Sequence, residues 1–176
     1  MKEKILEAAE RRVRKAGFAE MSFRDLASDV GIKSASVHYH FPTKFDLGEA
    51  LVEKYAKQFG ARLSEIDIGD LQNALERFVG LYAEALVVDE AICLCAIMGA
   101  ESIGLPQKVN QKTRAFFKMN ADWLEDLFET HLADRKTDIV AMIVAALEGA
   151  IIVASVSRDR AVFDRVARAA IGSVRQ

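Results

Sequence analysis

The sequence predicts an all-α protein of about nine helices. Apolar residues recur three or four positions apart along most of the 176 residues, which is the period of an amphipathic helix. No segment alternates apolar and polar residues as a half-buried strand does. The chain has only 2 prolines and 10 glycines, too few for the turns of a many-stranded sheet.

Two helices are expected at the N-terminus, the second of them short. The apolar residues of the first lie at helical spacing: Ile5, Ala9, Val13 and Ala16. Gly17 is suited to end this helix. The segment Ser22-Phe23-Arg24-Asp25 resembles a capping box with Asp in place of Glu, and the helix that it starts ends at Gly31.

A third short helix is predicted from about Ser34 to His40, because Pro42 disfavours helical backbone in the residue before it. Ser34 is expected to cap this helix in place of Lys33. Thr43 and Asp46 form a second capping-box pattern. The long helix that follows has a regular apolar face: Leu47, Leu51, Tyr55 and Phe59.

Five more helices are expected in the rest of the chain. Their segments are 71–86, 91–102, 106–128, 139–156 and 162–170. The breaks between them carry Gly, Pro or charged residues, and Pro106 fits the first position of a helix. This pattern completes the nine helices.

Composition fits a soluble globular protein, with 51% hydrophobic and 28% charged residues. No apolar signal segment opens the chain, and the two cysteines, Cys93 and Cys95, cannot build a disulfide framework. We therefore expect a cytoplasmic protein. The net charge of −2 conceals an asymmetry, since residues 1–48 carry nine Lys and Arg against seven Asp and Glu. No carboxylate lies between Asp29 and Asp46, which favours a surface that meets phosphates.

Residues 22–47 have the layout of a helix-turn-helix. Gly31 supplies the turn, and the angle between the two helices is expected to be buried by Leu26, Ala27, Ile32 and Val37. The second helix is positive and presents polar side chains that can reach base edges in a DNA groove. Duplex DNA is the expected partner.

The order SFRDLASDVGIKSASVHYHFPTKFDL resembles the N-terminal signature of TetR-family transcriptional repressors. The matching pieces are Ser22, Arg24, Leu26-Ala27, Gly31-Ile32, His38-Tyr39-His40-Phe41 and Thr43-Lys44 with Leu47. Lys33 departs from the Ser that is common in the family at the start of the recognition helix. The signature covers about a quarter of the chain, and the helix layout fits the family's nine-helix plan.

The resemblance implies a homodimer that places two recognition helices in the major groove of a palindromic operator. It also implies two kinds of DNA contact. The expected groove contacts are Lys33, Ser34, Ala35 and Tyr39, and the expected backbone contacts are Ser22, Arg24, Ser36, His40 and Lys44. His38 either touches DNA or packs within the fold. His38 and His40 lie two residues apart on a helix and so point in different directions, and we expect no metal site.

Residues 1–48 are therefore expected to form the DNA-binding domain, and residues 49–176 the domain for ligand binding and dimerisation. The segment Ile139–Val156 contains one ionisable residue, Glu148. A membrane span is the alternative for this segment, but it is slightly short and lacks a one-sided positive flank. We expect a helix that is buried by its own core and by the partner subunit. With the last helix it would form a four-helix dimer bundle, as the family does.

A small-molecule effector is also implied by the resemblance. The expected effector-binding residues are Tyr82, Cys93, Glu101, Phe116, Asn120 and Trp123. Trp123 and Tyr82 are the first choices, because each combines a ring with a polar tip. Core packing is the alternative for each aromatic residue, and Glu101 and Asn120 are either ligand anchors or surface residues.

The run CLCAIMGAE resembles the sixth-helix region of a TetR branch that includes electrophile-responsive repressors. Cys93 matches the reactive position of that branch. The neighbouring Asp89 and Glu90 would discourage a thiolate, whereas a nearby helix N-terminus would favour one. The alternative is a buried, inert cysteine.

Two other classes of function fit the sequence less well. An enzyme is disfavoured because the sequence shows no nucleophile–base pair, phosphate-binding loop or metal-ligand spacing, and no cofactor is expected. A helical adaptor that binds other proteins would not need a positive recognition helix. The sequence thus predicts a transcriptional regulator, most simply a repressor that its effector releases from DNA.

Overall fold

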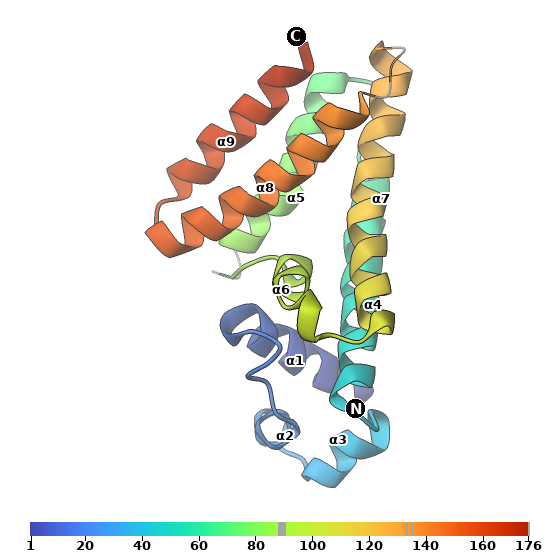
Figure 1. Ribbon diagram of the computed structural model, residues 1–176, viewed down its shortest axis with the longest axis vertical. Coiled ribbons are helices and arrows are strands. Elements are labelled where there is room, and N and C mark those ends of the chain that lie inside the picture. The colour runs from blue at the N-terminus through green and yellow to red at the C-terminus, as the bar shows by residue number, and fades with distance from the viewer. Residues whose placement is uncertain (88–90, 133, 135, 176) are drawn as a thin grey trace. The chain divides into compact units, whose positions relative to one another are not determined.

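The computed structural model describes residues 1–87, 91–132, 134 and 136–175, and within these ranges the fold is all-helical, which confirms the predicted class. Figure 1 shows the elements in chain order: α1 (Lys2–Ala16), α2 (Phe23–Val30), α3 (Ser34–His40), α4 (Lys44–Ser64), α5 (Leu71–Val87), α6 (Leu94–Ala100), the 3-10 turn η1 (Ser102–Gly104), α7 (Gln107–Leu132), α8 (Thr137–Ser157), α9 (Arg160–Gly172) and the 3-10 turn η2 (Ser173–Arg175).

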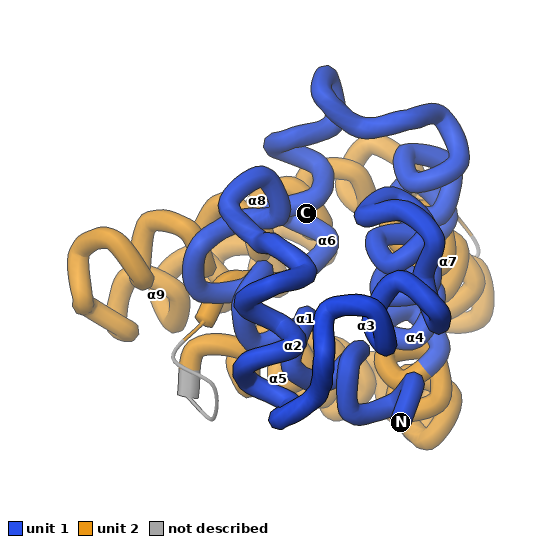
Figure 2. Tube along the Cα trace, turned by 90° about the horizontal axis from the view of Figure 1, so that it is seen from below, with its two compact units in different colours: residues 1–57, 94–115 blue, residues 58–93, 116–176 orange. Residues whose placement is uncertain are grey.

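The chain forms two compact units (Figure 2). Unit 1 contains residues 1–57 and 94–115, and unit 2 contains residues 58–93 and 116–176. The helix-turn-helix therefore shares its unit with α6, η1 and the first turns of α7. The division into domains at residue 48 stays a prediction.

The two capping pairs form as their spacing predicts. The Ser22 hydroxyl accepts a hydrogen bond from the backbone N–H of Asp25 at 3.2 Å and donates to the Asp25 carboxylate at 2.6 Å. At the start of α4, the Asp46 carboxylate accepts from the N–H of Thr43 at 2.9 Å, and the Thr43 hydroxyl accepts from the N–H of Asp46 at 3.1 Å. These contacts satisfy N–H groups that a helix start leaves open.

The turn between α2 and α3 depends on Gly31, whose φ of 72° lies in the left-handed region that favours glycine. The N–H of Ile32 returns to the carbonyl of Ala27 at 2.9 Å and closes the end of α2. Leu26 and Val37 are fully buried in the angle between the helices, Ala27 is buried, and Ile32 is partly exposed. The expected core of the helix-turn-helix is therefore largely confirmed.

The predicted cap of α3 is wrong. Lys33 occupies the N-cap position, makes no capping hydrogen bond with its side chain, and leaves Ser34 as the first helical residue. Two other starts also differ: α6 begins at Leu94 instead of Ala91, and α7 begins at Gln107, one residue after Pro106. The shift of one residue at α7 is common at helix ends, whereas the shift of three residues at α6 is larger than usual.

In unit 2, α8 packs against α5 and α9, and Figure 1 shows α8 and α9 side by side. The turn between them places Arg158 at φ 52°, and Asp159 caps α9 by accepting the N–H of Ala161 at 2.9 Å. By length and composition, α8 could cross a membrane. In the fold it is a core helix, with a buried face formed by Val140, Ile143, Leu147, Glu148, Ala150, Ile151 and Ala154.

Candidate DNA-binding and effector sites

The recognition helix α3 is anchored by one buried side chain and exposes most of the others. Val37 is fully buried, whereas Tyr39 is 84% exposed although it is a large aromatic residue. Lys33, Ala35 and His38 are also exposed, and the remaining predicted contacts on the helix are partly exposed: Ser34, Ser36 and His40. A short helix with an exposed tyrosine and cationic neighbours is the surface that groove binding needs.

His38 and Ser22 both have contacts within unit 1. The His38 ring meets the edge of Phe23 at 4.7 Å between centroids, and its Nδ1 lies 3.5 Å from the carbonyl of Pro42. The Ser22 hydroxyl is engaged in capping α2, as described above. Arg24 is exposed on α2. His38 therefore has contacts within the fold although it is exposed, and its contact with DNA stays a prediction.

Lys44 supports the fold beside the recognition helix. Its Nζ donates to the carbonyl of Ala19 at 2.7 Å and lies 5.0 Å from the centre of the Phe18 ring. Burial lowers the pKa of Lys44, opposed by the negative charges of Glu101 and Glu20. The ammonium group therefore stabilises the loop between α1 and α2, and any phosphate contact would come in addition to this contact.

Glu101 secures the same loop from the end of α6. Its two carboxylate oxygens accept from the N–H groups of Phe18 and Ala19, each at 2.8 Å. The loop starts at Gly17, whose φ is 92°, and an added Cβ there would lie 2.8 Å from Glu101 Oε1. Sequence analysis did not find this clamp, because it joins residues more than 80 positions apart.

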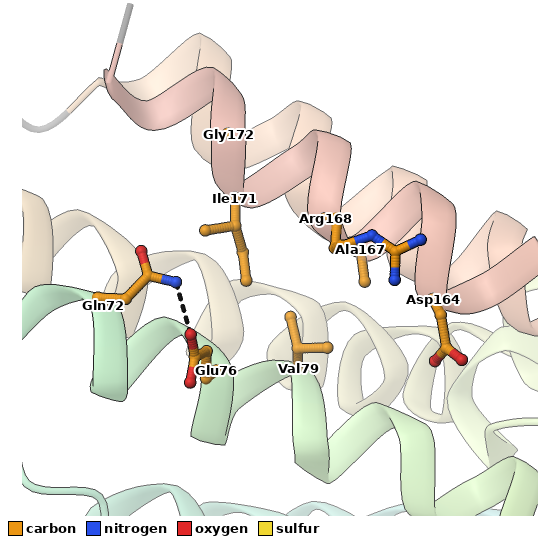
Figure 3. A pocket seen from close by; sticks show the side chains of 8 residues that line it. All are labelled: Gln72, Glu76, Val79, Asp164, Ala167, Arg168, Ile171 and Gly172. Atoms are coloured by element: carbon orange, nitrogen blue, oxygen red, sulfur yellow. Dashed lines mark hydrogen bonds between the residues drawn. The ribbon is translucent and has the colours of Figure 1, made fainter. Parts of the chain in front are cut away.

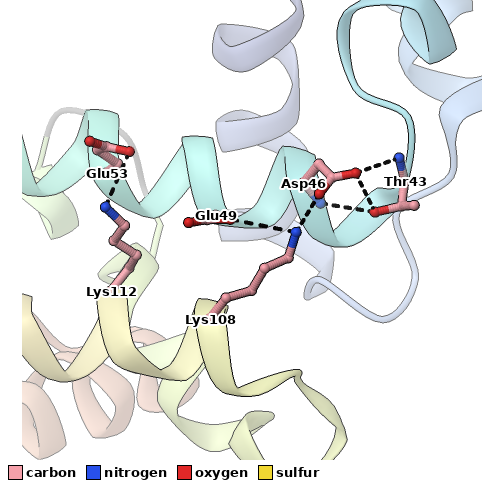
Figure 4. A network of polar contacts seen from close by, with 6 residues as sticks. All are labelled: Thr43, Asp46, Glu49, Glu53, Lys108 and Lys112. Carbon is pink, nitrogen blue, oxygen red and sulfur yellow. Dashed lines mark hydrogen bonds and ion pairs between the residues drawn. The ribbon is translucent and has the colours of Figure 1, made fainter.

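A ladder of ion pairs joins α4 to α7 within unit 1 (Figure 4). Lys108 pairs with Asp46 and, at 3.5 Å, with Glu49. One turn further along α7, Lys112 pairs with Glu53 at 3.4 Å. Hydrogen bonds from Lys108 and Thr43 lower the pKa of Asp46 to about 2. Sequence analysis also missed this ladder, although acids and lysines at helical spacing on two helices were a visible signal.

Unit 2 contains a cluster of aromatic rings. Trp123 stacks on Phe78 with the ring planes 6° apart and the centroids 5.3 Å apart. Tyr82 lies 5.3 Å from Phe78 and 5.5 Å from Phe59, and Phe116 lies 5.1 Å from Phe59. Three of the predicted effector residues, Tyr82, Phe116 and Trp123, are therefore brought into one cluster.

Comparisons with known proteins agree with this architecture. Residues 5–51 match the family model for bacterial regulatory proteins of the tetR family, and residues 72–169 match the model for the LmrA/YxaF-like C-terminal domain of transcriptional regulators. The second match alone covers more than half of the chain. The chain belongs to the TetR family of transcriptional regulators. This is a family of DNA-binding regulators that contain a helix-turn-helix and are not enzymes.

Individual relatives of this TetR-family chain match over nearly its whole length. The HTH-type transcriptional regulator CymR of Pseudomonas putida is 25% identical over 98% of this chain and 88% of its own. A TetR transcriptional regulator from Legionella pneumophila is 27% identical, with a TM-score of 0.91 over 98% of this chain and 96% of its own. A TetR-family regulator from Agrobacterium tumefaciens is also 27% identical, with a TM-score of 0.92 over the same shares.

The remaining predicted effector residues of the TetR-family chain lie in different places. Asn120 is fully buried in unit 2, where its Nδ2 donates to the carbonyl of Phe116 at 2.8 Å. Cys93 is buried beside Glu148, and Cys95 is buried as well. Glu101 belongs to unit 1 and is not grouped with the aromatic cluster. Asp89 and Glu90, named above as neighbours of Cys93, lie outside the described residues.

Two further features bear on the location of a binding site. Among residues 1–87, 91–132, 134 and 136–175, no group of three His, Cys, Asp or Glu side chains is arranged to hold a metal ion. A groove of about 500 Å³ lies between α5 and α9 (Figure 3). It contains none of the predicted effector residues, and its lining is Gln72, Glu76, Val79, Asp164, Ala167, Arg168, Ile171 and Gly172.

Proposed function

We propose that this TetR-family regulator is a homodimeric repressor that a small-molecule effector releases from a palindromic operator. The observation that carries the proposal is the exposed recognition helix, in which Val37 anchors the helix and Tyr39 is 84% exposed. Within unit 1, both Glu101 and Lys44 hold the loop between α1 and α2. A rigid head of this kind keeps the recognition helix in one orientation, which direct readout of base edges requires.

The proposed DNA contacts follow the family motif. Base contacts come from the start and the middle of α3, and contacts to the sugar–phosphate backbone come from both sides of it. The base contacts are Lys33, Ser34, Ala35 and Tyr39, and the backbone contacts are Ser22, Arg24, Ser36, His40 and Lys44. His38 is also proposed to contact DNA, without assignment to either group. Phosphate contacts of this kind position the protein but carry little sequence information.

The proposed dimer forms through α8 and α9. The exposed face of α8 has no charged side chain over four turns: Ala141, Met142, Ala145, Gly149, Ile152, Val153 and Val156. An apolar face of this length is stabilised when a second copy covers it, and its small residues allow close helix packing. Two half-sites one turn of DNA apart, about 34–36 Å, would then match the two heads.

The proposed effector binds in unit 2, near the cluster that contains Tyr82, Phe116 and Trp123. It shifts the population of dimers away from the DNA-binding form, and it does so only by its different affinity for the two forms. A role for Cys93 as an electrophile sensor would require a local opening, because the side chain is 2% exposed. The site of action is the cytoplasm, where the operator is.

Selection of bound fragments from random duplex DNA tests the proposal directly. We expect a palindromic consensus, and retention that weakens steeply as salt rises, because phosphate contacts release counterions. Sedimentation of the complex should show two subunits on each fragment. Recovery of no DNA even in dilute buffer, or of sites without symmetry, would contradict the proposed function.

A further inference from the structure

Glu148 is a buried carboxylate in the middle of α8. Its side chain is 8% exposed, and neither carboxylate oxygen has a hydrogen-bond partner that meets ordinary geometry among the residues the structure describes. A carboxylate that leaves water without partners is strongly destabilising. Buried polar groups in folded proteins are nearly always satisfied, so an orphaned carboxylate requires an explanation.

The described surroundings of Glu148 provide no positive charge. Burial raises its pKa to about 7, and the only opposing influence is a contact with the thiol of Cys93. A thiol is a weak hydrogen-bond donor and does not replace an N–H or O–H group. The free protein therefore holds the carboxyl group in an environment that disfavours its charged form.

A second buried acceptor lacks a donor in the same unit. Asn120 is fully buried on α7, and although its Nδ2 is bonded to Phe116, its Oδ1 has no partner among the described residues. Both orphaned groups are acceptors. A group that satisfied Glu148 would therefore have to donate hydrogen bonds, and the charge of Glu148 favours a donor that is also a cation.

The rings of unit 2 suit the rest of such a ligand. Phe59, Phe78, Tyr82, Phe116 and Trp123 form one chain of ring contacts with centroids 5.1–5.5 Å apart. Aromatic surfaces accommodate apolar groups and attract cations through the faces of their rings. An anionic group would gain no attraction from the ring faces and would meet the carboxylate of Glu148 without a described counter-charge.

We propose that the effector carries a protonated primary amine on an apolar body and that Glu148 is the residue that pairs with the ammonium group. This inference rests on the proposed function for the existence of an effector, and it adds the chemical class and the anchoring residue. The ion pair forms only in the complex, where it replaces an unsatisfied carboxylate with a charge-assisted hydrogen bond.

Three probes of the same shape test this inference with the full-length protein. Phenylbutylamine is a cation at neutral pH, phenylbutanol is neutral, and phenylbutyrate is an anion. Fluorescence of Trp123, the single tryptophan of the chain, measures binding. We expect the amine to bind about tenfold or more tightly than the alcohol, since a hydrogen bond to a charged group is worth about that much. We expect the acid to bind most weakly.

Variants then locate the charge. In Glu148→Gln, the amine should lose its advantage of about tenfold or more while the affinity for the alcohol stays the same. The matched control is Glu65→Gln, which removes an exposed carboxylate from unit 2 and should leave all three affinities unchanged. The inference is overturned if the wild type binds the amine and the alcohol equally well or binds neither of them. It is also overturned if the preference for the amine persists in Glu148→Gln.

The proposed function is tested by a separate measurement of DNA binding. Retention of the wild-type protein on its selected operator is measured without any probe. A protein that holds a palindromic operator but does not prefer the amine keeps the proposed function and loses this inference. A protein that prefers the amine but ignores every duplex loses the repressor proposal and keeps the cation site.

Discussion

Tyr39 shows how much one exposed side chain reveals about function. A tyrosine that is 84% exposed contributes little to the core, and its ring contacts only His40, at 5.3 Å, among the ring contacts of the described residues. Sequence analysis could select it, because the helical period places it opposite the buried Val37. Its ring and hydroxyl are therefore available for a DNA base or phosphate.

We expect Tyr39→Ala to weaken operator binding by about tenfold or more while leaving the melting temperature within about 1 °C, since loss of one specific contact costs about 1–3 kcal/mol. Ile103→Ala is the matched control, because Ile103 is likewise a strongly exposed large apolar residue of unit 1 but lies on η1. Gel-shift titration and thermal unfolding give the two readouts. Unchanged DNA affinity in Tyr39→Ala would remove this residue from the interface.

Glu148 leads to a prediction on pH. Its pKa is raised from 4.5 to about 7 in the folded protein, so between these values the folded state holds a proton that the unfolded state has released. The free energy of unfolding should therefore fall as pH rises from about 4.5 to 7 and stay low above that. The shift corresponds to about 3 kcal/mol at most.

Glu148→Gln should remove this dependence on pH and raise the free energy of unfolding at pH 8 by about 1–2 kcal/mol. The gain is smaller than the full value of about 3 kcal/mol because the amide N–H groups of the glutamine are then buried without partners. Urea unfolding at pH 5 and pH 8 measures the free energy of unfolding of the wild type and of Glu148→Gln. A wild-type protein that is equally stable at the two values would show that the carboxyl group is paired in solution.

At the scale of elements, sequence analysis found what depends on near neighbours. Ser22 with Asp25 and Thr43 with Asp46 lie three residues apart, so their capping bonds could be predicted. The start of α3 could not, because Lys33 occupies the N-cap without a side-chain hydrogen bond and backbone geometry alone sets the boundary. The Glu101 clamp was missed for a different reason, since it depends on which loop the end of α6 approaches.

This clamp predicts a specific effect on the recognition head. In Glu101→Gln, one oxygen remains to accept an N–H, and the other becomes a donor that faces the N–H of Phe18 or Ala19. We expect a loss of about 1–3 kcal/mol in stability and weaker operator binding. Glu20→Gln is the control, since it also removes a charge near Lys44 but is exposed. Hydrogen exchange at Phe18 and Ala19 should speed up only in Glu101→Gln.

At the scale of the whole molecule, the exposed face of α8 explains why a core helix is long and apolar enough to cross a membrane. One face is buried against α5 and α9, and the opposite face is apolar without being covered in a single chain. The sequence predicts the apolar character of both faces but not which of them meets a partner, because a helix that is hydrophobic all round has no polar side to orient it.

Gly149 lies within this exposed face and provides the sharpest test of the dimer. A Cβ added there meets nothing within 4 Å in the chain, so Gly149→Glu should fold, whereas a pair of buried carboxylates at a two-fold interface should separate the subunits. The control is Gly80→Glu on α5, where an added Cβ also meets nothing within 4 Å. Sedimentation should show a monomer only for Gly149→Glu, with operator affinity reduced by at least about a hundredfold, because each head then binds one half-site alone. A dimeric Gly149→Glu would move the interface to another face and would leave the apolar side of α8 without a role.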